Sequence, residues 1–304
     1  MTALQSLRPA ASGVARNPLL IVITALFGLS QLPNMFLQPT RPLLAAGVSL
    51  LSTGVLIFAL PFFQGGLLAM ASEAIRGQTS LETLIVEGKA QYVSLLLAYF
   101  VLLAINLTFA FLVVFAVFFG VVGASVSGLP AGDSWTLLAV IAIVGGGLTV
   151  VYLLITLTIQ FYAHAIVLDG TELVDGFRRS VGVVRSNLLS VFGYSLVLLI
   201  GGLLLGTVGA IGGIVSAAWG ATSPAVPASP LADFVMRIEP TTAVVAGVGV
   251  LYVAATGLFG ALYATYSVAF YESIRPAVDT ATADTATADT EAPSDGGSGP
   301  TRQR

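Results

Sequence analysis

Hydrophobic residues along this chain gather in six long stretches that contain no charged side chain. The stretches cover residues 17–40, 42–72, 90–132, 134–168, 186–232 and 240–271, and short charged segments separate them. A helix needs about 20 mostly apolar residues to cross the hydrocarbon core of a bilayer. Each stretch exceeds that length, so the pattern predicts an all-α, polytopic membrane helical bundle with six transmembrane helices.

The overall composition supports a membrane protein. Apolar residues make up 56% of the chain and charged residues only 9%, whereas about 25% is typical of soluble domains. Cysteine is absent, which excludes disulfides and thiolate metal sites. Arginine far outnumbers lysine and acidic residues exceed basic ones. This balance favours a GC-rich, salt-adapted source, because carboxylates stay hydrated in strong brine.

The positions of the basic residues predict the orientation of the spans. Of the 12 basic residues, all but Arg41 and Arg237 fall on the side of the N-terminus when six spans are drawn. Basic residues in short loops are retained in the cytoplasm. We therefore expect a multi-pass protein of the cell membrane whose N- and C-termini are both cytoplasmic.

The charged segments between the spans share a plan, which predicts an internal repeat. Each has an amphipathic elbow helix followed by a hairpin of two spans, and the approximate units are 1–76, 77–169 and 170–275. The first unit fits least well, because Pro9 would break an elbow helix that started at Leu4.

Two shorter expectations accompany the repeat. In the second unit Thr79 and Glu82 have the spacing of a capping box, which predicts a helix start there. Residues 276–304 form an acidic tail rich in Thr, Ala, Gly and Ser, which cannot bury a core and is expected to be disordered.

At these elbows the chain resembles a known family. The most telling segment is 73–99, EAIRGQTSLETLIVEGKAQYVSLLLAY, and residues 168–194 are the second. The pattern of a small turn with Gly, an Arg-bearing amphipathic helix and a span beginning near Asn looks like haloarchaeal six-span membrane proteins of unknown function. These are related to the membrane domain of glycerophosphoryl diester phosphodiesterases. The catalytic domain of those enzymes has no counterpart here, so the resemblance does not imply their activity.

Polar residues inside spans are the default functional candidates. His164 and Gln160 lie four residues apart on one predicted helix face. We interpret them as packing or interfacial residues, and the alternative is a proton relay or a substrate contact. Asn106 and Gln64 lie deeper and are interpreted as hydrogen-bonding glue between helices. A lone histidine cannot form a metal site of three or four ligands, and no cofactor motif occurs. We therefore expect no catalytic, cofactor or metal site and no enzyme.

A stripe of glycines in the fifth stretch is the most specific packing signal. Gly202, Gly206, Gly209 and Gly213 fall on one helix face and would let another helix approach closely. The simpler interpretation is packing within the chain, and the alternative is a contact in a homo-oligomer. The lipid bilayer is the expected partner, with a membrane partner protein as a further possibility and no nucleic acid.

Three classes of function compete. The first is an integral membrane protein with a structural or accessory role, and the second is a transporter or permease subunit, since transporters are often built from repeats. Against the second stands the lack of a charged cluster in mid-membrane. The third, a membrane enzyme acting on lipid, lacks an acid, base or metal constellation. The first class is the prediction.

Overall fold

The computed structural model describes residues 2–126, 134–220 and 242–275, and nearly all of them are helical. The helices are α1 (Thr2–Gln5), α2 (Leu7–Arg16), α3 (Pro18–Thr40), α4 (Pro42–Arg76), α5 (Leu81–Ala90), α6 (Tyr92–Val126), α7 (Ser134–Ile159), α8 (Tyr162–Asp169), α9 (Leu173–Ser186), α10 (Leu188–Gly220) and α12 (Thr242–Ile274). The described residues contain no strand. The all-α fold predicted from the sequence is therefore confirmed.

Five of the described helices are each long and apolar enough to cross a membrane. They are Pro42–Arg76, Tyr92–Gly120, Ala142–Asp169, Leu188–Ile211 and Ala246–Ile274. A sixth candidate is the pair Ala3–Arg16 and Pro18–Pro33, whose two parts meet at 90°. The fold is thus that of a multi-pass membrane protein with five spans, or six if the bent pair counts as one.

Three short helices, α2, α5 and α9, precede the spans α3, α6 and α10, and we call them elbow helices. One residue separates each elbow helix from its span, and in all three cases that residue carries a carboxamide: Asn17, Gln91 or Asn187. Below, the elbow end of a span means the end that lies beside these helices. The predicted acidic tail and the loop before α12 lie outside the described residues.

Local sequence explains where the elbow helices begin. The chain turns at Ser6, so α2 starts at Leu7 and Pro9 falls in its first turn, where the missing N–H of proline costs no helical hydrogen bond. Pro9 therefore does not break the elbow. The capping box expected from Thr79 is wrong by one residue, since Ser80 caps α5 by accepting a hydrogen bond from the Thr83 N–H.

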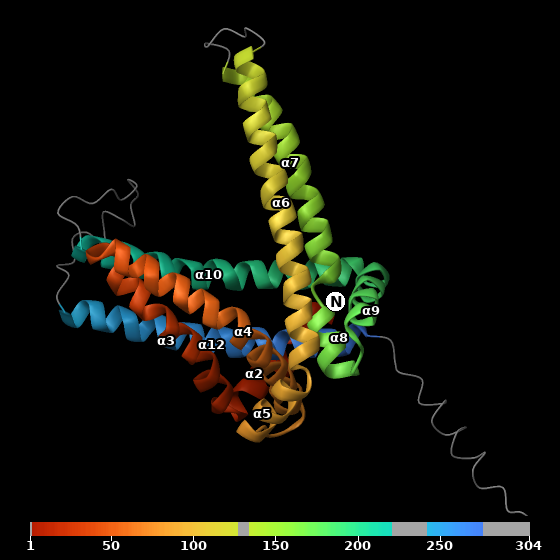
Figure 1. The fold of residues 1–304 in the computed structure, drawn as a ribbon. Coiled ribbons are helices and arrows are strands. Elements are labelled where there is room, and N and C mark those ends of the chain that lie inside the picture. The colour runs from red at the N-terminus through yellow and green to blue at the C-terminus, as the bar shows by residue number, and fades with distance from the viewer. Residues whose placement is uncertain (1, 127–133, 221–241, 276–304) are drawn as a thin grey trace, which may run out of the picture. The chain divides into compact units, whose positions relative to one another are not determined.

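The last span, α12, packs against the first span, α3, and also contacts α4, α10 and the elbow helix α2 (Figure 1). Glycine permits the close approach to α3. A Cβ at Gly257 would lie 2.8 Å from the Ile21 carbonyl oxygen, and the Thr24 hydroxyl donates a 2.6 Å hydrogen bond to the Gly257 carbonyl. The two ends of the membrane domain are therefore joined in its interior.

Burial is concentrated toward the elbow end of the spans. Phe161, Phe270 and Tyr271 are completely buried and pack together with Tyr194 in one aromatic cluster. The rings of Tyr194 and Phe270 stack with centroids 4.4 Å apart. Along the spans, by contrast, many large hydrophobic side chains stay exposed, as expected where lipid replaces water. The elbow end is thus where the chain builds a core of its own.

Candidate functional site

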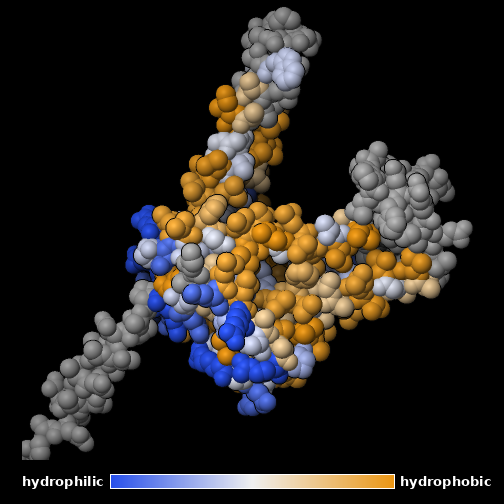
Figure 2. All heavy atoms as spheres, turned by 180° about the vertical axis from the view of Figure 1, so that it is seen from behind, coloured by the Kyte–Doolittle hydropathy of each residue, from blue (hydrophilic) through white to orange (hydrophobic). Residues whose placement is uncertain are grey.

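The polar chemistry of the described residues is gathered at the elbow end. Figure 2 shows hydrophilic residues around the elbow helices and hydrophobic residues over the spans. This division matches a protein whose spans face lipid and whose elbows face the headgroups and water. The elbow end is therefore the candidate functional region.

Asn17 joins the first elbow to the turn after α4. Its side-chain amide donates hydrogen bonds of 2.9 Å to the Gly13 carbonyl and 3.0 Å to the Gly77 carbonyl, and its side-chain oxygen accepts one of 3.0 Å from the Thr79 N–H. Asn17 is only 4% exposed. A buried carboxamide with partners on both sides holds the corner between α2 and α3 against the α4–α5 connection.

Asn187 occupies the same position in the third elbow. Its amide donates to the Val183 carbonyl at 3.1 Å, within its own elbow helix, and to the Ile274 carbonyl at the end of α12, at 3.4 Å. The longer second bond makes this connection weaker than the one at Asn17. Two of the three carboxamide corners therefore bind at the C-terminal end of a long helix that follows later in the same proposed unit, α4 for Asn17 and α12 for Asn187.

An ion pair and a hydrogen bond to a second ion pair tie α12 to its neighbours. Arg76 at the end of α4 lies 2.6 Å from Glu272, which also accepts a 3.1 Å hydrogen bond from the Ser72 hydroxyl. On the adjacent residue of α12, the Tyr271 hydroxyl donates to Asp169, and Arg179 of α9 lies 2.8 Å from the same carboxylate. These charges hold helix ends together.

The Asp169 pair is the more buried of the two. The Asp169 side chain is 1% exposed and that of Arg179 is 28% exposed, whereas Arg76 is 64% exposed. The turn that brings α9 back to this carboxylate needs a left-handed residue, and Gly170 supplies it with φ of 63°. The Asp-Gly sequence thus serves the turn and the ion pair together.

His164 is buried among aromatic rings. Its ring centroid lies 5.5 Å from that of Phe161 and 5.4 Å from that of Tyr271. Neither ring nitrogen has a hydrogen-bond partner among the described residues, and the buried amide nitrogen of Gln160 likewise has none. The helix is interrupted between α7 and α8 at Gln160, where the Phe161 N–H donates to the Ser180 hydroxyl of α9 at 3.1 Å. The two predicted polar candidates therefore sit at an irregular point of a span.

The other two polar candidates contact neighbouring spans. The Asn106 side-chain oxygen accepts a 2.8 Å hydrogen bond from the Tyr152 hydroxyl, which links α6 to α7, while its amide donates to the Leu102 carbonyl of its own helix. Gln64 on α4 lies 3.5 Å from the Tyr162 hydroxyl. No hydrogen bond among the described residues connects Asn106 or Gln64 to His164.

The glycine stripe of α10 does not mark the closest helix contact of the described residues. A Cβ at Gly202 or Gly206 would meet nothing within 4 Å, and one at Gly209 would only touch the Tyr252 ring at 3.9 Å. Gly213 continues the stripe one turn further along α10.

Close contacts occur instead at glycines that sequence reasoning passed over. A Cβ at Gly66 would overlap the Leu84 carbonyl oxygen, and one at Gly260 would lie 2.8 Å from the Thr24 side chain. The signal for the contact with α3 that went unnoticed in the sequence is the pair of small residues Gly257 and Ala261, four positions apart in α12.

No three His, Asp or Glu side chains of the described residues lie together in a way that would hold a metal ion. The arrangement at the elbow end instead consists of hydrogen bonds and ion pairs between helix termini. With the long apolar helices, it defines a helical multi-pass membrane protein.

More particularly, the chain belongs to the family described as a domain of unknown function, DUF7847, which matches residues 1–274. No curated protein and no solved structure matches the chain.

Proposed function

We propose that this protein is a non-catalytic component of the cell membrane with a structural or accessory role. The observation that carries the proposal is that polar side chains at the elbow end bond to other helices of the chain. Asn17 and the carboxylates of Asp169 and Glu272 are all engaged in holding helices to one another. Such engagement leaves little polar chemistry for acting on a substrate.

The proposal includes an orientation with both termini in the cytoplasm. Its support is the concentration of basic residues in the segments that contain the elbow helices and the termini. The natural chain contains no cysteine, so single cysteines introduced at Thr2 and at Ser294 test this orientation by labelling in intact cells. Both should resist a membrane-impermeant maleimide until the cells are opened, and labelling of either from outside would overturn the orientation.

We also propose that the domain is a threefold repeat of elbow, carboxamide residue and hairpin. The supporting feature is the recurrence of a carboxamide between elbow and span at Asn17, Gln91 and Asn187. The unit boundaries proposed from the sequence, after 76 and 169, fall at the ends of α4 and α8. The resemblance to haloarchaeal six-span proteins and to the membrane domain of glycerophosphoryl diester phosphodiesterases supports the same plan and a halophilic source.

A transporter or permease subunit is the second candidate, and His164 is the observation that favours it. A buried imidazole without a hydrogen-bond partner is unfavourable unless something else supplies one, and a transported proton or polar solute would do so. The neighbouring unpartnered amide of Gln160 adds to this argument.

Proton flux into vesicles tests the proton-transport form of the second candidate against the accessory role. The purified protein is placed in liposomes that contain the pH-sensitive dye pyranine, and a potassium gradient with valinomycin drives protons inward. The accessory role predicts a rate equal to that of protein-free liposomes. A faster rate that the His164→Leu variant abolishes would refute the accessory role and establish a proton path.

A further inference from the structure

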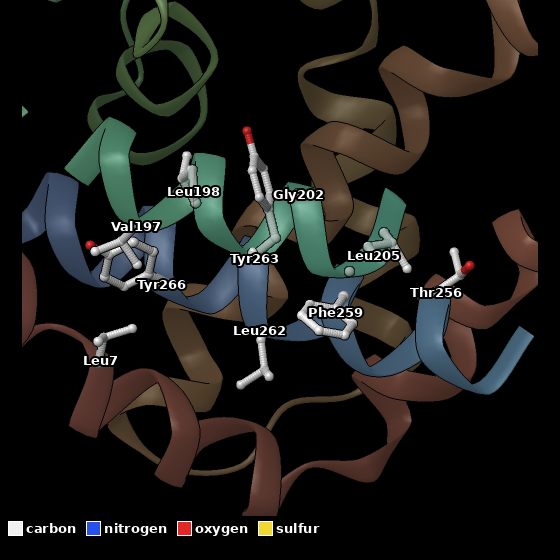
Figure 3. Close-up of a pocket in the computed structure, with 12 residues that line it drawn as sticks. Leu7, Val197, Leu198, Gly202, Leu205, Thr256, Phe259, Leu262, Tyr263 and Tyr266 are labelled. Atoms are coloured by element: carbon white, nitrogen blue, oxygen red, sulfur yellow. The ribbon is translucent and has the colours of Figure 1, made fainter. Parts of the chain in front are cut away.

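The pocket of about 330 Å³ between α10 and α12 offers no feature that would select a ligand (Figure 3). Leu198 and Leu205 line it from α10, and Phe259 and Leu262 line it from α12. Among the described residues that line it, none carries a charge. Selective sites combine apolar surface with a few polar groups, and α10 meets such groups at its first residues, where the charged elbow helix α9 ends.

Two arginines of α9 lie on one exposed face of that helix. Arg178 and Arg185 are seven residues apart, which is close to two full turns, so their side chains leave the helix in nearly the same direction. Both residues are exposed, and the side chain of Arg178 is 79% accessible. Ser180, Val183 and Val184, on the other side of the helix, are buried. The elbow helix α9 therefore presents this arginine pair outward.

Gly182 leaves space between the two arginines. It lies four residues after Arg178 and three before Arg185, on the same face, and it is exposed. A Cβ there would meet no atom within 4 Å. The Cα atoms of the two arginines are about 10 Å apart along the helix, so both long side chains can reach the space over Gly182. Two guanidinium groups around an open position match a phosphate group, which each can bind through two N–H donors.

The charge of this face is only partly neutralised within the chain. The Asp175 carboxylate lies 3.5 Å from Arg178, but both side chains are mostly exposed, and a pair of this kind holds together weakly. Arg185 has no ion-pair partner among the described residues. Arg179, by contrast, is held by the buried Asp169. The arginine pair is therefore available to an anion from outside the chain.

An apolar surface begins directly beyond the arginine pair. Leu189 and Phe192, in the first two turns of α10, are 86% and 64% exposed, and Leu196 and Leu203 continue the same exposed stripe. Their spacings of three, four and seven residues place them on one side of the helix. An anion bound at the arginine pair would therefore have exposed hydrocarbon beside it along the span.

We propose that Arg178 and Arg185 bind the phosphate of an anionic phospholipid. The phosphate lies over Gly182, and the acyl chains run along Leu189 and Phe192 of α10. The two positive charges select a negatively charged headgroup, and the neighbouring apolar stripe favours a lipid over free phosphate. This binding does not depend on which side of the membrane the elbow helices face, so a wrong orientation would leave it intact.

Native mass spectrometry of the full chain in detergent tests the proposal. The protein is titrated separately with dioleoylphosphatidylglycerol and with dioleoylphosphatidylcholine, and the ratio of the two affinities is measured. The natural chain should prefer phosphatidylglycerol. Arg178→Gln and Arg185→Gln should each lower this preference about fivefold, as expected for one basic side chain at an anionic lipid surface. Asp175→Asn, which releases Arg178 from its carboxylate, should raise the preference, and a loss of folding would not have that effect.

Arg8→Gln is the matched control, because it removes an exposed arginine of the elbow helix α2 instead of α9. It should leave the preference unchanged. Equal affinity of the natural chain for the two lipids would overturn the proposal. Equal losses for Arg8→Gln and Arg185→Gln would also overturn it, since they would show an effect of net charge alone. Millimolar inorganic phosphate should not displace the lipid, and displacement would assign the arginine pair to a soluble anion.

Discussion

Replacing Asn17 with alanine should be the most destabilising change of a polar side chain at the elbow end. The variant loses three hydrogen bonds of 2.9, 3.0 and 3.0 Å, and a longer one of 3.5 Å, at a residue that is 4% exposed. A net contribution of about 1 kcal/mol for each bond gives a loss of about 3 kcal/mol in the free energy of unfolding. The Gly77 carbonyl and the Thr79 N–H also lose their partner, and polar groups left unpaired add to the loss in the free energy of unfolding.

Two matched asparagines provide the scale for this measurement. Asn187→Ala removes two bonds within its own elbow helix, one of them exposed, and one of 3.4 Å to Ile274, so we expect about 1 kcal/mol. Asn106→Ala removes one bond between spans, for which about 0.6 kcal/mol is typical. Unfolding in mixed micelles with increasing dodecyl sulfate, followed by circular dichroism, measures all three variants. A loss for Asn17→Ala no greater than that for Asn106→Ala would refute the assignment of Asn17 as the corner of the fold.

The same unfolding assay checks two further contrasts. Gly257→Leu should cost about 1–3 kcal/mol, because its Cβ would lie 2.8 Å from a backbone oxygen, whereas Gly247→Leu, with nothing within 4 Å, should be close to neutral; equal effects would contradict the close packing of α12 on α3. Asp169→Asn should cost about 2 kcal/mol, because it leaves the half-buried Arg179 without its carboxylate, while Arg76→Ala at an exposed pair should stay within about 1 kcal/mol. A larger loss for Arg76→Ala would reverse the ranking of the two ion pairs.

Much of the fold follows from the sequence because a bilayer core offers no water to hydrogen-bond with the backbone. Uncharged stretches longer than a span leave a helix as the structure that satisfies every backbone group in lipid. The elbow helices were predictable from their charged and apolar spacing, although the cap moved from Thr79 to Ser80. Pro9 was expected to disrupt the first elbow, and the turn at Ser6 placed it in a position where proline is accepted.

The side-chain arrangement was less predictable because it depends on which helix faces which. The glycine spacing in α10 was visible, but spacing alone does not reveal whether a neighbouring helix fills the resulting space. The contact at Gly257 involves Thr24, which is 233 residues away in the chain. His164 was placed near the interface from sequence depth, and its enclosure by Phe161 and Tyr271 required the packing of α8 against α12.

The contact between the first and last spans has a consequence for how the protein is made. A ribosome delivers α3 to the membrane long before α12, so Thr24 and Arg76 wait for Gly257 and Glu272 through most of translation. The nascent hairpins therefore remain an unfinished assembly until the C-terminal helix arrives. Closure of the bundle therefore awaits α12, and a chain that stopped before this helix would leave Thr24 and Arg76 without these two partners.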